Sequence, residues 1–134
     1  MPEAEDAFLK LNTAPPLDFA AALNQQGTPG PAARGTVIQL FGSAEGLYLD
    51  DQDQKPAREF TAPGSGSPLY YTTSLPEVRI GGVPAKVVFS GLAPGLTGAW
   101  QINVVVPDEV AVGTLPVAIN YEGDQLRSVD VKIE

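Results

Sequence analysis

The stretch VRIGGVPAKVVFSGLAPG, residues 78–95, decides the fold that the sequence predicts. Residues 78–80 alternate apolar and charged side chains, which is typical of a strand with one buried face. Gly81-Gly82 then supplies the positive φ angles that a two-residue hairpin turn needs. Residues 84–91 return as a second strand, and we expect the loop at 90–95, rich in glycine and proline, to cross to a second sheet. The stretch therefore predicts a β-hairpin that helps to close a two-sheet core.

Short strands and tight turns predominate on both sides of this hairpin. The 134 residues include 14 glycines and 13 prolines, a composition that favours short strands over helices. Further strands are predicted at residues 35–42, 69–73, 99–107, 115–123 and 126–134. The chain is therefore predicted to be all-β, an immunoglobulin-like antiparallel β-sandwich of about seven to nine strands.

The first part of the chain admits two interpretations. In DFAAALNQQG, residues 18–27, Asp18 could cap a short helix, or the segment could be extended and end in a turn. We favour the extended form. The proline-rich stretch TPGPAARG follows it as a linker or loop. We therefore divide the chain into an N-terminal segment, residues 1–27, which would supply an extra or pairing strand, and a sandwich domain, residues 28–134.

The alternation within each strand predicts which side chains form the core. Apolar residues that share one phase point to the same face of a sheet. The predicted buried set is Ile38, Leu40, Ile80, Val87, Phe89, Ile102, Val104, Val117, Ile119, Val129 and Val131.

Charge and composition exclude several functions. With 16 acidic and 8 basic residues the formal net charge is −8, and such a surface repels nucleic-acid phosphates and anionic lipids. The chain has no histidine and no cysteine, so neither a Ser-His-Asp nor a Cys-His catalytic site can be built. No apolar run reaches the roughly 18 residues of a membrane span. We expect no catalysis, no nucleic-acid binding and no membrane insertion.

One acidic cluster raises the question of a metal. Asp50, Asp51 and Asp53 lie together in LDDQDQ, and clustered carboxylates are ligands for calcium. The pattern lacks the glycine and the closing glutamate of an EF-hand loop. A solvated acidic loop is the favoured interpretation, so we predict no cofactor, with calcium as the alternative.

Tyrosine and tryptophan side chains suggest a glycan-binding surface. Aromatic rings stack on amphipathic sugar rings, and Tyr70, Tyr71 and Trp100 are the candidates. Adjacent tyrosines in a strand point to opposite faces, so one of Tyr70 and Tyr71 is expected to be exposed. Trp100 is in phase with core valines, and the favoured alternative for it is core packing.

A short alternating segment at residues 7–12 suggests assembly. Phe8, Leu9 and Leu11 precede a proline break at Pro15-Pro16, so this segment could pair with the sheet edge of a neighbouring subunit. The favoured alternative is an ordinary first strand of the same domain.

Three stretches resemble a known family: RGTVIQLFGSAEGL (34–47), VRIGGVPAKVVFSGLAPGLTGAWQINVVVP (78–107) and VGTLPVAINYEG (112–123). They are similar to the C-terminal domain of secreted acidobacterial (Solibacter-type) proteins, which has a Val-x-Ile-Gly-Gly-x-Pro-Ala-x-Val hairpin and an Ala-Pro-Gly-Leu-x-Gly loop. The order of parts is also similar to immunoglobulin-like IPT/TIG domains. Residues 46–68 depart most from the pattern.

The resemblance implies an immunoglobulin-like sandwich at the end of an exported protein, secreted or at the cell surface, and it implies no catalytic residues. The function predicted from these observations is a non-catalytic structural, adhesion or assembly module of an exported bacterial protein or filament. Its expected partners are other protein domains or copies of itself. The alternative is a glycan-binding module that uses exposed aromatic side chains.

Overall fold

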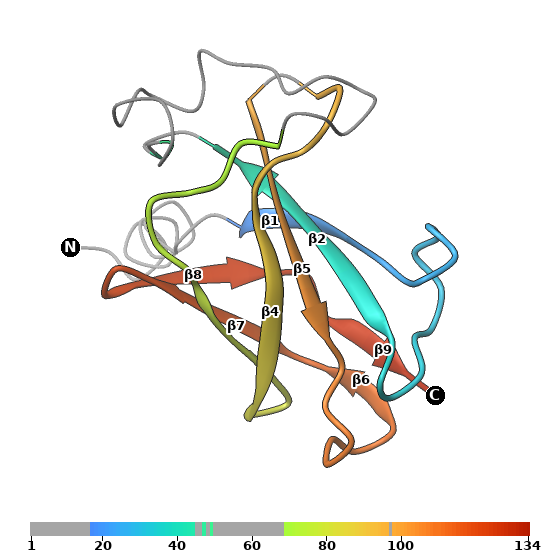
Figure 1. The fold of residues 1–134 in the computed structure, drawn as a ribbon. Helices are drawn as coiled ribbons and strands as arrows, with labels where there is room; N and C mark the ends of the chain where they lie inside the picture. The colour runs from blue at the N-terminus through green and yellow to red at the C-terminus, as the bar shows by residue number, and fades with distance from the viewer. Residues whose placement is uncertain (1–16, 45–46, 48, 50–68, 97) are drawn as a thin grey trace, which may run out of the picture.

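A computed structural model describes residues 17–44, 47, 49, 69–96 and 98–134 (Figure 1). These residues form nine strands and no helix. The strands are β1 (Leu17–Leu23), β2 (Val37–Ser43), β3 (Glu77–Ile80), β4 (Val83–Leu92), β5 (Ala99–Val105), β6 (Gly113–Leu115), β7 (Val117–Tyr121), β8 (Asp124–Ser128) and β9 (Val131–Ile133). The prediction of an all-β sandwich is confirmed.

Seven strands pair in the order β1-β2-β5-β4-β3-β7-β8, and β1 pairs with β8 to close the ring. In Figure 1, β2, β5 and β4 form one layer, and β7 and β8 run across behind it. The β1–β8 pair is parallel, whereas the other pairs in the ring are antiparallel. An odd number of strands in a closed ring requires one parallel pair. Strands β6 and β9 form a separate two-stranded sheet.

The extended interpretation of residues 18–27 is confirmed, because β1 covers most of them. The turn after β1 is held by Asn24, whose side-chain oxygen accepts hydrogen bonds from the backbone N–H groups of Gln26 and Thr28, each at 3.0 Å. Strand β1 falls within the predicted N-terminal segment, and it is a member of the same ring as the strands of the sandwich.

The hairpin that the fold prediction rests on is confirmed. Strands β3 and β4 pair in antiparallel register, with Ile80 opposite Val83. Gly81 and Gly82 join them at φ angles of 57° and 82°, the left-handed region that residues with a side chain rarely adopt.

Most of the predicted core is buried. The confirmed residues are Ile38, Leu40, Ile80, Ile102, Val104, Val117, Ile119 and Val131. Trp100 and Phe19 pack in the same cluster, with ring centroids 4.9 Å apart. The inward faces of both layers thus meet in one interior.

Val87, Phe89 and Val129 are half-buried, so the prediction of full burial was wrong for these three. A bulge lies between Val87 and Phe89, where the register with β5 shifts. One extra residue in a strand exchanges its two faces, so Phe89 turns outward while Ser90 and Leu92 become buried.

Val129 has a different reason for its partial exposure. The chain leaves β8 at Ser128 and begins β9 at Val131, so Val129 lies in the connection between two sheets. Its backbone N–H donates to the Phe19 carbonyl at 3.2 Å. Val129 is therefore held by its contact with β1, at the point where the ring closes, and not by the pairing of a regular strand.

Two further expectations about this region were wrong. The loop at 90–95 does not cross to another sheet: Ser90 to Leu92 belong to β4, and the loop leads to its neighbour β5. The strand expected at 69–73 consists of isolated bridges, one of which pairs Tyr71 with Gly91. Both differences arise because β4 is longer than predicted and receives the 69–73 segment alongside its second half.

Candidate functional site

A hollow lies beside the bulge, on the outer face of β4 and β5. It has a volume of about 290 Å³. Its lining consists of Leu69, Tyr71, Val88, Phe89, Pro94, Gln101 and Asn103. Five of these are apolar or aromatic, two are amides and none carries a formal charge, although the whole chain is strongly acidic. This composition suits an uncharged ligand with apolar and hydrogen-bonding parts.

Aromatic side chains form one part of the hollow. Tyr71 is 46% exposed, and Val88, which lies on the outward phase of β4, is 49% exposed. The Tyr71 and Phe89 rings meet edge to face, with centroids 5.5 Å apart and planes at 62°. This single edge-to-face contact covers at most one face of the Tyr71 ring. It also holds the Tyr71 ring in a fixed orientation.

A pair of amides forms the other part. Gln101 and Asn103 are two residues apart on β5, so both lie on its outer face. The Gln101 Nε2 group donates to the Asn103 Oδ1 atom at 2.8 Å. Within the described residues the two side chains make no other hydrogen bond. The Asn103 Nδ2 group and the second lone pair of its Oδ1 atom therefore remain for a ligand.

The predicted aromatic residues divide between surface and core. Tyr71 is exposed, as the alternation of adjacent tyrosines requires, and Tyr70 is half-buried against the core cluster. Trp100 is 3% exposed, and its Nε1 donates to the Ser90 Oγ atom at 2.9 Å. Its ring also meets Tyr121 edge to face. Trp100 is therefore a core residue, as the alternative interpretation held.

Sequence reasoning identified Tyr71 and missed the other six lining residues, three of which are informative. Phe89 was assigned to the core because a bulge leaves no mark in the hydrophobic pattern. Gln101 and Asn103 alternate with buried apolar residues in the most apolar strand of the chain. Two amide side chains at outward-facing positions of an apolar strand could have indicated a polar binding surface.

Other predicted site residues lie outside the described residues. These are the acidic group Asp50, Asp51 and Asp53 and the assembly group Phe8, Leu9 and Leu11. In the described ranges, no three His, Cys, Asp or Glu side chains cluster in a way that could hold a metal. The same ranges contain no helix long and apolar enough to cross a membrane.

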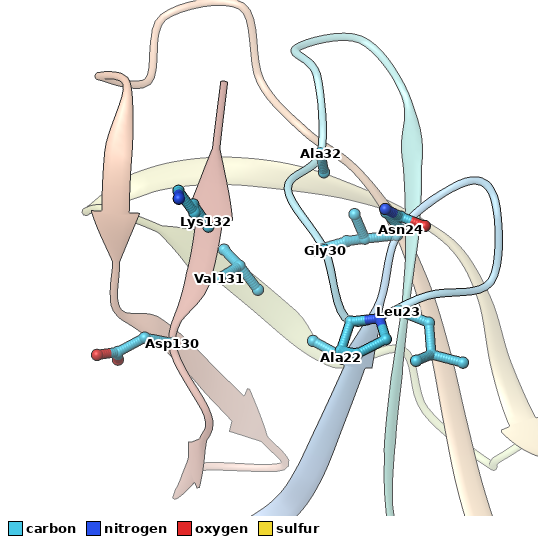
Figure 2. A pocket seen from close by; sticks show the side chains of 10 residues that line it. Ala22, Leu23, Asn24, Gly30, Ala32, Asp130, Val131 and Lys132 are labelled. Atoms are coloured by element: carbon cyan, nitrogen blue, oxygen red, sulfur yellow. The ribbon is translucent and has the colours of Figure 1, made fainter.

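A second hollow lies between β9 and the end of β1, and Figure 2 shows it from close by. Its volume is about 30 Å³, which is the share of one water molecule in the liquid. Asn24 lies at its side, but the Asn24 amide is engaged by its own loop, with Nδ2 donating to the Pro31 carbonyl at 3.1 Å. This hollow is a packing feature of the loop and is too small for a ligand.

Comparisons with family models, with curated proteins and with solved structures found no match to the chain. The site is therefore interpreted from its own chemistry.

Proposed function

We propose that this protein is a non-catalytic structural and adhesion module of an exported bacterial protein, and that it makes contact through the outer face of β4 and β5. The observation that carries the proposal is the exposed, uncharged hollow around Tyr71 and Val88. Exposed apolar side chains gathered at one place on a soluble domain mark a contact surface more often than scattered ones do. The secreted location is supported by the resemblance of residues 78–107.

The closed ring makes a face the better contact surface than an edge. Strand addition needs an unpaired edge, and within the described residues the seven strands of the ring each have two neighbours. Among the described residues, only the short two-stranded sheet of β6 and β9 would offer an edge for strand addition. A partner would therefore approach the side chains of a layer rather than its backbone.

The lining also supports contact rather than catalysis. A hydrolytic or transfer site needs a nucleophile or an acid–base pair within reach of a substrate. The hollow offers a tyrosine, two amides and apolar groups. Such groups bind and orient a partner, and the lining holds no histidine, cysteine, lysine or carboxylate to act as a general base.

Bead adhesion tests this proposal with three candidate surfaces at once. Beads carrying the chain would be mixed with insoluble polysaccharide, with bacterial cell envelopes and with beads carrying the same chain. We expect adhesion to at least one of these surfaces. Val88→Glu, which places a charge at the hollow, should abolish it, whereas Ala118→Glu, at an exposed position of β7, should not.

The proposal fails if the wild-type beads adhere to none of the three surfaces. It also fails if Val88→Glu beads adhere as strongly as Ala118→Glu beads, because the contact would then lie elsewhere.

A further inference from the structure

We propose that the hollow on β4 and β5 binds a neutral sugar ring within a glycan chain, with Tyr71 stacked on the ring and the Asn103 amide bonded to its hydroxyl groups. This inference rests on the proposed function, because it names the ligand class of the same surface. It follows from three properties of the lining: an exposed ring, a fixed amide and the lack of charge.

Tyr71 supplies the stacking surface. A sugar ring is amphipathic: its C–H groups form an apolar face, and its hydroxyl groups project from the rim. Such a face packs on an aromatic ring that has an apolar body and a polar tip. Tyr71 is nearly half exposed, and the edge contact with Phe89 holds its orientation. A fixed ring loses little conformational freedom when the ligand arrives.

Asn103 supplies the polar contact, and Gln101 positions it. The hydrogen bond from Gln101 leaves the Asn103 amide with two N–H donors and one acceptor lone pair. Two neighbouring sugar hydroxyl groups can each donate and accept, so they match this combination. Gln101 is only 8% exposed, which makes it a support for Asn103 rather than a ligand contact.

The absence of charge selects a neutral glycan. No lining residue is acidic or basic, and the chain as a whole carries a net charge of −8. An anionic sugar would therefore meet long-range repulsion without a local cation to offset it. A cationic ligand would find no carboxylate in the hollow to pair with.

The size of the hollow limits the contact to a short part of a chain. Ligand pockets usually have volumes of roughly 300–1,000 Å³, and this hollow of about 290 Å³ is at the lower end. Binding of a free oligosaccharide should therefore be weak, with a dissociation constant on the order of 0.1–1 mM. Many copies on one surface would adhere far more strongly through avidity.

The test is a titration of the full chain, labelled with ¹⁵N and followed by NMR. The probes are four neutral tetrasaccharides (cellotetraose, chitotetraose, mannotetraose and maltotetraose) and one anionic probe, tetragalacturonate. We expect at least one neutral probe to shift the side-chain amide signals of Asn103 and Gln101 in a saturable way. The anionic probe should leave these signals unchanged.

Variants then assign the contacts. Tyr71→Ala should weaken binding about ten-fold or more, and Asn103→Ala by a similar factor. Tyr71→Phe keeps the ring and should bind within about three-fold of the wild type. Val112→Ala is the control, because Val112 is exposed but does not line the hollow. Unchanged backbone spectra of the core residues will show that each variant is folded.

The inference is overturned if no neutral probe shifts the amide signals, if tetragalacturonate binds as well as they do, or if Tyr71→Ala binds like the wild type. Bead adhesion separates this failure from failure of the proposed function. If the beads adhere in a Val88-dependent way but no glycan binds, the proposed adhesion function stands and the glycan inference is wrong. Loss of both results would remove both proposals.

Discussion

The two halves of β4 show how one strand can serve both the core and the surface. The first half pairs with β3 on one side and β5 on the other, in regular antiparallel register. The second half has the segment around Tyr71 beside it, and the bulge offsets its register with β5. The regular half packs half-buried side chains such as Val87 against the core, whereas the irregular half contributes buried residues to the core and also lines the hollow outside. A single inserted residue separates these two roles.

Four consecutive residues after the bulge allow the two halves to be compared by mutation, because neighbours in a strand point to opposite faces. The expected effects fall along the chain from Leu92 back to Phe89.

Leu92→Ala should have the largest effect. Leu92 is 1% exposed because the bulge turns it inward, so its truncation removes buried methyl groups and leaves a cavity. We expect a loss of about 2–5 kcal/mol in the free energy of unfolding, measured by urea denaturation. A loss below about 1 kcal/mol would show that Leu92 faces outward and that the bulge is misplaced.

Gly91→Ala should follow, at about 2–3 kcal/mol. A Cβ atom at this position would collide with the Tyr70 carbonyl oxygen and lie 2.9 Å from the Phe89 ring. Gly27→Ala is the matched control, because Gly27 has open space but a positive φ of 78°. It should cost only about 1–2 kcal/mol through backbone strain. Equal losses in the two variants would contradict the close approach of Tyr70 to β4.

Ser90→Ala should lower stability by about 1–3 kcal/mol, since it leaves the buried Trp100 Nε1 donor without its acceptor. The Ser90 Oγ atom accepts from Trp100 Nε1 at 2.9 Å and lies 2.9 Å from the Thr72 Oγ1 atom. Thermal melts of this variant and of Thr114→Ala, at an exposed position in β6, would measure the difference. Equal melting temperatures for the two variants would show that the Ser90 hydroxyl group is not buried in solution.

Phe89→Leu should have the smallest effect, about 1 kcal/mol or less. Phe89 is half-buried on the outer face, so the variant loses mainly the edge contact with Tyr71. The same variant should nevertheless weaken adhesion, because the Tyr71 ring would no longer be held in place. A loss as large as that of Leu92→Ala would mean that Phe89 belongs to the core and that no bulge is present.

Local rules were sufficient for most of the strands and for most of the core. Alternation assigned Ile38, Ile80 and Ile102 to the interior correctly, and Gly81-Gly82 marked the first hairpin. These features depend on the period of a strand and on the φ angles of a turn, which are properties of neighbouring residues. The exposed position of Tyr71 followed from the same period.

The candidate site depends on contacts that the sequence does not encode locally. The bulge before Phe89 lies between the part of β4 that pairs with β3 and the part beside the Tyr71 segment, about 20 residues away along the chain, while β5 pairs along the other side. Closure of the ring likewise brings Phe19 beside Ser128 across almost the whole length of the chain. The sequence by itself determines which residues alternate, whereas only tertiary packing decides where the alternation shifts, because the energy of a bulge depends on the strands on either side of it.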